Sequence, residues 1–437
     1  MADFNEIGTK MQELFGEIAQ TIAIETGFRQ RVSKLGGAEV AEALIAGWLV
    51  NPQASRSELA QLVGVTKQAI DQVLSEKGAL FLEKLLEKLV EQVISSEPTS
   101  LELLKRFNRV LVLDSSVITL PAALKEKWQG CGKAASPSEA GLKLHVMLDL
   151  VSGTLYGPAL TAARTHDRAG PHQNWQLAKG DLRIGDLGYF SLGRLQETKA
   201  EQAYFLSKVQ TGVRIYNQEK AKYQALSEWL GQQDQTTVDC EVKLGVRKNL
   251  ECRLIAWQVP NEVVEKRQHK VTDEARRRQQ AVSAEQQSLT YWTVYITNLP
   301  QTHLSPAEVA VLYRLRWQIE LLFKLWKSLG EIDEWCSEKP WAILAELYAK
   351  LIGQVVQHWL SLVGSWAEPE RSLIKVSRVV KSRLAGLMAH LRQGQGLVAE
   401  IALLAQDLSQ GCKLERRKKR PSSFQLSIAP PDLNHLI

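Results

Sequence analysis

The chain has 437 residues, of which 45% are hydrophobic and 23% are charged, a composition typical of globular proteins with a large core and two to four domains. No apolar run reaches the length of a membrane span, and five cysteines without a Cys-x-x-Cys pair argue against a disulfide framework or a zinc site and indicate reduced cytosolic thiols. The net charge of +6 is compatible with a polyanionic partner.

Residues 1–98 are predicted to form a helical domain, because apolar and polar residues alternate at a helical period. The first twenty residues carry acids and lack the basic and apolar segments of a signal peptide, so we expect a cytoplasmic protein. Within this domain, residues 55–76 show the pattern of a helix-turn-helix, with Gly64 between two amphipathic segments. The alternative is a short helical hairpin inside a small bundle.

The helices of this motif are defined by their expected caps and buried sides. These are Ser57 as the cap of the first helix, Leu59 and Leu62 on its buried side, Thr66 or Lys67 at the start of the second helix, and Ile70, Val73 and Leu74 on its buried side. Lys67 and Gln68 would face outward and reach base edges or phosphates in a DNA major groove.

After a polar break at residues 95–100, the chain changes to a pattern of strands. Strands are predicted at residues 109–114, 141–150, 154–160, 182–186 and 203–209, and short helices at residues 173–178 and 193–198. A three-stranded meander followed by alternating helices and strands is the order of an RNase H-like mixed sheet in the α/β class. The first and fourth strands end in acids, Asp114 and Asp186, which would lie close together if those strands are neighbours.

Residues 211–297 contain three strand-like segments rich in β-branched and aromatic residues, and a charged stretch at residues 261–287. We interpret them as a β-rich insertion that leaves the sheet domain. The predicted organisation is a helical N-terminal domain (1–98), an RNase H-like domain in two parts (99–210 and 298–345), the insertion domain (211–297) and a helical C-terminal region (346–437). Five basic residues at positions 416–420 are expected to form a phosphate-attracting or solvated tail.

Residues 310–329 lack Pro and Gly and are predicted to form one long helix, whose start Ser305 caps. At about 100° per residue, four polar residues share one stripe and five apolar residues form the adjoining buried side. The stripe consists of Tyr313, Arg316, Glu320 and Lys327, and the buried side of Leu312, Leu315, Ile319, Leu322 and Trp326. The alternative is an ordinary amphipathic helix with i, i+4 charge pairs.

Asp114, Asp186 and Glu320 are the candidate metal ligands. Carboxylate oxygens are the ligands that Mg²⁺ prefers, and a pair of these ions can activate the attacking water and stabilise the leaving oxygen in phosphodiester cleavage. Taken singly, an aspartate at the end of a strand is more often a turn or cap residue.

The spacing Tyr313-x2-Arg316-x3-Glu320-x6-Lys327 resembles the Tyr-Arg-Glu-Lys signature of the insertion-sequence-four family of bacterial DDE transposases. The segments LDSS around Asp114 and GDLGYF around Asp186 resemble the other two acidic motifs of that family, and the resemblance covers residues 109–344. It implies that Asp114, Asp186 and Glu320 are catalytic and bind two Mg²⁺ ions, for which Mn²⁺ substitutes. It also implies that Tyr313, Arg316 and Lys327 contact DNA phosphates near the cleaved strand.

Related transposases flip a base near the transposon end. By resemblance, Trp292 would be the tryptophan on which this base stacks. Trp317, directly after Arg316, is similar to a second aromatic residue beside the arginine of the family. The alternative for Trp292 is a strand residue packed inside the insertion domain.

The expected function is that of a bacterial insertion-sequence transposase associated with the nucleoid. It would bind terminal inverted repeats, flanking DNA and target DNA as a homodimer, without a membrane partner. It would cut and paste by Mg²⁺-dependent cleavage, through a hairpin intermediate, and by strand transfer. The alternatives are an RNase H-like DNA nuclease without transposition and a non-catalytic DNA-binding regulator that kept the fold.

Overall fold

The structure is a computed structural model that describes residues 2–29, 35–131, 139–277, 279–415 and 421–428. The predicted basic tail at residues 416–420 lies outside these ranges. The chain divides into two compact units: unit 1 contains residues 1–100, 114–165 and 317–416, and unit 2 contains residues 101–113, 166–316 and 417–437. Helices and a mixed sheet confirm the predicted α/β class. None of the described helices combines the length and apolar character needed to span a membrane.

Unit 1 is mainly helical. Its helical elements are α1 (Phe4–Glu13), η1 (Leu14–Ile18), α2 (Ala19–Glu25), α3 (Gly37–Ala41), η2 (Glu42–Ala46), α4 (Gly47–Val50), α5 (Arg56–Leu62), α6 (Lys67–Val73), α7 (Glu76–Glu91), η3 (Ala122–Leu124), α14 (Trp317–Ser328), α15 (Pro340–Ser361), α16 (Leu373–Gln393) and α17 (Leu397–Gly411). Its strands are β2 (Ala140–Asp149) and β3 (Leu155–Ala162), which pair antiparallel, together with residues 114–120 of β1 (Val110–Leu120).

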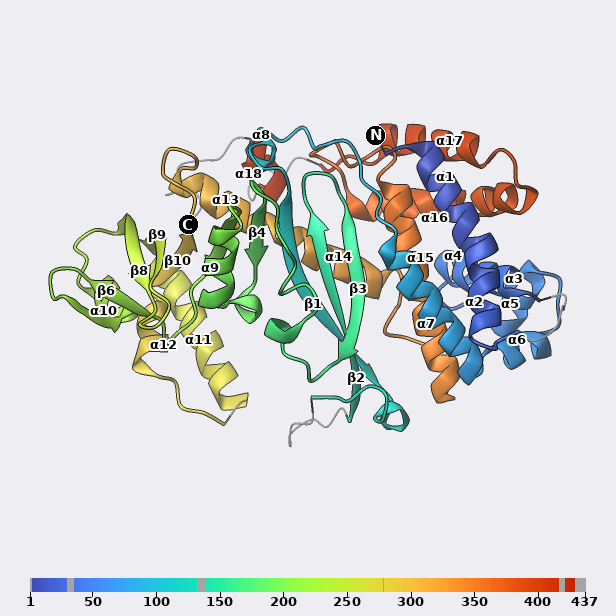
Figure 1. Cartoon of the computed structure of the whole chain (residues 1–437), viewed down its shortest axis with the longest axis horizontal. Helices are drawn as coiled ribbons and strands as arrows, with labels where there is room; N and C mark the ends of the chain where they lie inside the picture. Colours follow the sequence, from blue (N-terminus) through green and yellow to red (C-terminus); the bar gives the residue numbers. More distant parts are fainter. Residues whose placement is uncertain (1, 30–34, 132–138, 278, 416–420, 429–437) are drawn as a thin grey trace. The chain divides into compact units, whose positions relative to one another are not determined.

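Helix α15 forms the centre of unit 1, because every residue from Ala342 to Ser361 is buried. A helix that is buried on all sides needs neighbours on all sides: α7 lies alongside α15 (Figure 1), and α4 and α16 also contact it. The only charges on this buried stretch form a pair, Glu346 and Lys350, 2.8 Å apart. Lys350 also donates to the carbonyls of Glu331 and Glu334, which offsets part of the cost of burying the pair.

Two helices separated by a turn, α5 and α6, lie where the helix-turn-helix was predicted. Gly64 in the turn has φ +66°, a conformation that favours glycine, and Thr66 caps α6. The predicted Ser57 cap is wrong: Ser55 caps α5 and forms a reciprocal capping box with Glu58. Leu62, predicted to be buried, is 43% exposed, because it lies at the last position of α5, where the chain turns away.

Unit 2 contains most of the sheet. Its helical elements are α8 (Glu102–Lys105), η4 (Asp167–Ala169), η5 (Leu187–Tyr189), α9 (Leu192–Ala200), α10 (Leu226–Gly231), α11 (Asn261–Arg277), α12 (Ala284–Leu289), α13 (Pro306–Leu315) and α18 (Ser423–Ile428). Its strands are residues 110–113 of β1, β4 (Leu182–Gly185), β5 (Tyr204–Lys208), β6 (Arg214–Asn217), β7 (Lys222–Ala225), β8 (Thr237–Leu244), β9 (Leu250–Gln258) and β10 (Trp292–Thr297). They are ordered β1-β4-β5-β10-β9-β8-β6-β7.

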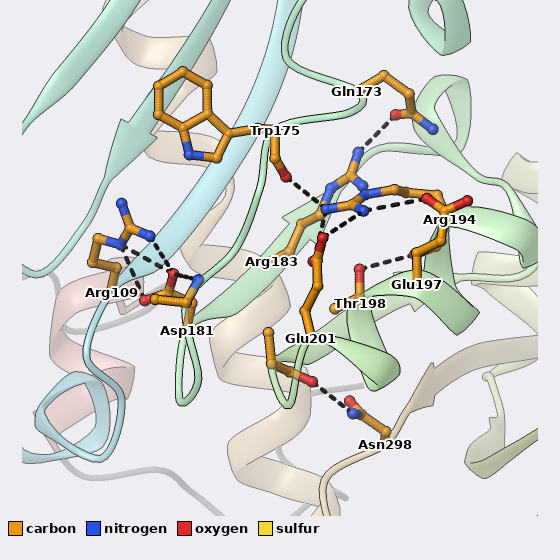
Figure 2. Close-up of polar contacts among 12 residues, drawn as sticks. Arg109, Gln173, Trp175, Asp181, Arg183, Arg194, Glu197, Thr198, Glu201 and Asn298 are labelled. Carbon is orange, nitrogen blue, oxygen red and sulfur yellow. Dashed lines mark hydrogen bonds and ion pairs between the residues drawn. The ribbon is translucent and has the colours of Figure 1, made fainter.

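The parallel strands β1 and β4 are fixed at their starts by an ion pair. Arg109 Nε lies 3.0 Å from Oδ1 of Asp181, whose side chain is buried (Figure 2). The amide of Leu182 donates to the carbonyl of Arg109 over 2.8 Å. These contacts set a register in which Leu113 pairs with Gly185. Contrary to the prediction, Asp114 is not at the end of its strand, because β1 continues to Leu120.

A buried network joins β4 to the helix that follows it. Arg183 on β4 donates to Gln173 over 2.6 Å, and Arg194 on α9 contacts Glu201 and the carbonyl of Trp175 (Figure 2). Burial, and to a smaller extent the charge of Arg194, lower the pKa of Arg183 to about 10. Residues 173–178, predicted as a short helix, instead run without helical structure through this network.

The segment predicted to leave the sheet extends it instead. Strand β10 pairs antiparallel with β5 from Tyr295↔Lys208 to Thr297↔Leu206, and with β9 on its other side. At the end of β10, Asn298 donates to the carbonyl of Ala203 over 2.8 Å (Figure 2). The pairing of β10 with β5, which are distant in sequence, depends on tertiary packing, and local sequence patterns do not reveal it.

The predicted single helix over residues 310–329 consists of two helices, α13 and α14. Ser305 and Glu308 form the predicted capping box at the start of α13. At its end, the amide of Arg316 donates to the carbonyl of Tyr313 over 3.2 Å. This i to i−3 bond tightens the last turn into 3₁₀ geometry and separates the two helices at Arg316.

Candidate active site

In unit 2, Asp186 lies near three cations that are distant from it in the sequence, Lys208, Arg267 and Arg316. Asp186 follows β4 directly and is partly exposed. Lys208, the last residue of β5, is also partly exposed, and burial is the main cause that lowers its pKa. The charges of Arg267 and Arg316 lower this pKa further, whereas that of Asp186 raises it. Among the charges that shift the Lys208 pKa, cations therefore outnumber carboxylates.

Tyr313 lies at the centre of this group. Its ring centroid is 4.8 Å from that of Tyr295 on β10, with Lys208 Nζ at 5.3 Å and Arg316 Cζ at 5.8 Å. Such distances suit aromatic and cation–π contacts. The predicted buried side of the helix is confirmed, but Tyr313 and Arg316 are themselves buried, with 6% and 7% exposure. The polar stripe is therefore covered at these two positions, because α13 packs against β5.

The Tyr313 hydroxyl is buried and has no hydrogen-bond partner among the described residues. Burial is also the main cause that raises the pKa of Tyr313 above its ordinary value, although the charge of Arg316 opposes this rise. A buried hydroxyl without a partner is costly by about 1–3 kcal/mol. The arrangement thus offers an uncharged donor beside cations, which suits an anionic ligand.

A cavity of about 290 Å³ opens beside Lys208. Its walls combine three cations with apolar and aromatic side chains: Lys208, Val209, Leu226, Arg267, Lys270, Leu289, Trp292, Thr293 and Val294. Trp292 is 7% exposed and packs in the same core cluster as Leu226. Trp292 is therefore a packed strand residue that also forms part of the cavity wall. An aromatic surface next to several cations can accept a planar group that carries a phosphate.

Unit 1 contains the other two candidate ligands. Asp114 is partly exposed on β1 and accepts the amide of Ser115 at 2.8 Å. Glu320 lies in the first turn of α14 and is also partly exposed. In the last turn, Lys327 Nζ donates to the carbonyl of Val117 over 2.9 Å and lies 3.9 Å from Asp333. This contact attaches α14 to the part of β1 that follows Asp114.

The chemistry of the three candidates fits a hard divalent cation, since all three are partly exposed carboxylates. Within the described ranges, no group of three or more His, Cys, Asp or Glu side chains has the arrangement of a metal centre. Asp186 belongs to unit 2, whereas Asp114 and Glu320 belong to unit 1. Their convergence on shared ions therefore stays a prediction.

The remaining predicted DNA contacts lie on exposed positions of unit 1. Trp317, at the start of α14, is 58% exposed. Lys67 and Gln68 are exposed on the first turn of α6. An ion pair between Arg56 and Asp71 joins α5 to α6, so the surface that carries Lys67 and Gln68 is held to its neighbouring helix.

Sequence reasoning missed three cations of the cavity, Lys208, Arg267 and Lys270. A lysine at the end of a mostly buried strand with Tyr204, Phe205 and Leu206 was an available signal for Lys208. No comparable signal marked Arg267 and Lys270, because α11 carries many charges of both signs. Only the packing of α11 distinguishes the two residues from their neighbours.

Residues 105–354 match the family described as "Transposase DDE domain". The transposase for insertion sequence element IS231F of Bacillus thuringiensis subsp. israelensis is 28% identical over 363 residues, which cover 77% of this chain and 75% of the relative. The transposase for IS1151 of Clostridium perfringens is 27% identical over 308 residues, which cover 65% of this chain and 64% of the relative. A putative transposase for IS186A of Escherichia coli is 25% identical over 252 residues, which cover 56% and 64% of the two chains.

Proposed function

Because the chain belongs to the transposase DDE domain family, and so is an enzyme that cleaves DNA and transfers its strands, we propose that it moves an insertion sequence by cut and paste. The single observation that carries the proposal is the gathering of Lys208, Tyr313 and Arg316 around Asp186 in unit 2. Metal-assisted phosphodiester cleavage uses groups that hold the metal ions next to groups that hold phosphate.

Divalent metal ions are used generally by this family, and we propose Asp114, Asp186 and Glu320 as the ligands of two Mg²⁺ ions, with Mn²⁺ as a substitute. The register of β1 and β4 supports this assignment, since Leu113 pairs with Gly185 and each is followed directly by an aspartate. The bond between Lys327 and Val117 supports the inclusion of Glu320, because it attaches α14 to β1. When bound, the ions would supply Lewis-acid activation of a nucleophilic oxygen.

We assign the binding of phosphate near the cleaved strand to Tyr313, Arg316 and Lys208. Arg316 offers a planar fork that matches two phosphate oxygens, and Lys208 offers a compact charge. Tyr313 offers a hydroxyl that has no partner among the described residues. The Tyr313 hydroxyl would therefore gain an interaction on binding DNA. Lys327, which donates to the β1 backbone, and Trp317, which is exposed, would contact the same DNA.

We further propose that cleavage proceeds through a hairpin and that the cavity in unit 2 receives a base displaced from the transposon end. The cavity has an aromatic wall at Trp292 and cations at Lys208 and Lys270. A base removed from its stack regains part of the lost stacking energy on an aromatic side chain, by about 1–3 kcal/mol. The sharp strand geometry of a hairpin would favour such displacement.

Recognition of the terminal inverted repeats is assigned to α6, through the exposed residues Lys67 and Gln68. Joining two ends in one reaction calls for two copies of the protein, so we propose a homodimer on DNA.

The proposal is tested by incubating the protein with DNA ends taken from either side of its own reading frame, with Mg²⁺, with Mn²⁺ and with a chelator. Denaturing gels should show metal-dependent nicks, then a product that migrates as a hairpin. An added supercoiled plasmid should receive the freed ends. Cleavage that is equally fast in the chelator would refute the metal assignment, and cleavage without hairpins would refute the intermediate.

A further inference from the structure

We propose that Arg267 is a positioning residue, which holds the β10 edge that carries Trp292 and thereby sets the aromatic wall of the cavity. This inference rests on the proposed function of the cavity, and it assigns to α11 a task in base capture. Arg267 would act through the protein backbone, not through contact with DNA.

The first half of β10 has a strand on one side only. Strand β9 pairs with β10 from Trp292 to Thr297, whereas β5 pairs with it only from Tyr295 to Thr297. Gln258, opposite Trp292, directs its amide to the carbonyl of Thr236 on the β8 side. In an antiparallel pair of this kind, both residues turn their amides and carbonyls away from each other. The Trp292 carbonyl therefore lies on the edge that β5 leaves uncovered.

Arg267 supplies the missing donor. Its Nη1 donates to the Trp292 carbonyl over 2.9 Å and to the Thr290 carbonyl over 3.3 Å, and its Nη2 donates to Thr293 Oγ1 over 2.8 Å. One guanidinium thus binds three acceptors on Thr290, Trp292 and Thr293. Lysine cannot reproduce this geometry, because only the planar fork presents several fixed N–H groups.

The donor itself is held in place. Val264, one turn earlier on α11, is buried, and the Arg267 side chain is partly buried, so burial lowers its pKa. Lys270, one turn later, is exposed and lines the same cavity. Helix α11 therefore presents one cation to the β10 backbone and leaves another available to a ligand. Arg267 and Lys270 are three residues apart, so both lie on the same side of α11.

The test separates an indirect role from a direct contact with DNA. Arg267→Lys keeps the charge and loses the fork, Arg267→Ala loses both, and Arg276→Ala is the matched control, since Arg276 is on the same helix and strongly exposed. Each variant is examined with DNA ends that carry 2-aminopurine at successive positions, whose fluorescence rises when the base leaves the stack. Trp292→Ala and the double variants with Arg267 complete a mutant cycle.

We expect both Arg267 variants to lose the fluorescence rise and to slow hairpin formation by about tenfold, with Arg276→Ala unchanged. In the Trp292→Ala background, the Arg267 substitution should add little. The salt dependence of DNA affinity should stay as in the wild type for Arg267→Ala, whereas loss of a phosphate contact would lower the slope by about one. Thr293→Val removes one acceptor and should give a smaller loss.

Three results would overturn the inference. They are full activity of Arg267→Lys, additive effects of Arg267→Ala and Trp292→Ala, or an effect of Arg267→Ala that is accounted for by a lower unfolding temperature while Thr293→Val behaves as wild type. A different result, no effect of Trp292→Ala on the fluorescence rise, would refute the proposed base cavity itself. The two failures are therefore distinguishable.

Discussion

The ring of Tyr313 on α13 packs 4.8 Å from the ring of Tyr295 on β10, and the Tyr313 hydroxyl is buried without a hydrogen-bond partner among the described residues. The contact fixes Tyr313, the first residue of the Tyr-Arg-Glu-Lys spacing, to β10, which belongs to the segment predicted as an insertion. Lys208 Nζ and Arg316 Cζ lie 5.3 Å and 5.8 Å from the centroid of the same ring. A hydroxyl held in this way costs stability in the free protein and is available to a bound phosphate.

Replacing this hydroxyl should change stability and activity in opposite directions. Tyr313→Phe removes an unsatisfied polar atom, so the free energy of unfolding should rise by roughly 1 kcal/mol. The variant also loses a donor to phosphate, so strand cleavage should slow by about tenfold. Denaturant unfolding and single-turnover cleavage measure the two effects. Tyr291→Phe, at an exposed position, is the control, and a Tyr313→Phe variant with unchanged cleavage would contradict the assignment.

Removing a single candidate carboxylate should abolish chemistry and spare DNA binding. Asp114→Asn, Asp186→Asn and Glu320→Gln keep the shape of the side chain and lose its charge. We expect cleavage to fall on the order of 10³-fold or more, with gel-shift affinity for the ends unchanged. The matched substitution Asp273→Asn, on the exposed side of α11, should have no effect. If one of the three variants cleaves normally, that residue is not a metal ligand.

Lys208 should make DNA affinity depend on alkaline pH. Burial, together with the nearby cations, lowers its pKa below the ordinary 10.5, so Lys208 loses its charge at a lower pH than an exposed lysine does. Affinity should therefore weaken as pH rises toward 10.5. Lys208→Arg keeps the charge and should remove this dependence, whereas Lys220→Arg, at an exposed position, should leave it in place. Fluorescence anisotropy at a series of pH values measures the effect.

His358 should make unit 1 less stable in acid. Its Nε2 lies 2.7 Å from the carbonyl of Gly153, and burial is the main cause that lowers its pKa to about 4, from an ordinary value of 6.5. The unfolded chain therefore binds a proton first as pH falls. The stability contribution is complete above pH 6.5 and is lost between pH 6.5 and 4, by roughly 3 kcal/mol.

The comparison that isolates this effect is between wild type and His358→Gln. Glutamine can donate to the same carbonyl and does not titrate. The free energy of unfolding of the His358→Gln variant should therefore fall less than that of the wild type over this pH range. Denaturant unfolding at pH 7, 6, 5 and 4 supplies the measurement. Parallel pH profiles for the two proteins would show that His358 does not contribute.

The exposed face of α6 should determine binding to the terminal repeats. Gln68→Ala should weaken binding to the repeat by about 1–3 kcal/mol and leave non-specific binding unchanged, as expected for a base contact. Lys67→Ala should weaken binding to all sequences and reduce the salt slope by about one. Competition assays with repeat and random DNA distinguish the two patterns. Lys88→Ala on α7, an exposed lysine outside this face, serves as the control.

Most of the local structure and the candidate acids could be predicted from the sequence alone. Apolar periodicity identified the strands that precede Asp114 and Asp186 and the buried side of the α13–α14 region, because side-chain alternation and helical repeat are properties of adjacent residues. The spacing from Tyr313 to Lys327 indicated the family by its resemblance to a signature, which also lies within one short stretch of the chain. These features need no knowledge of what packs against them.

The tertiary structure alone decided which distant residues meet. That β10 lies beside β5, that Tyr313 is buried against Tyr295, and that Arg267 reaches the Trp292 carbonyl all depend on pairing and packing between segments far apart in the chain. Local patterns state that a strand or helix has an apolar side, and many partners can satisfy that requirement. The choice among partners is made by the whole fold, which is why the cavity and its cations became visible only in three dimensions.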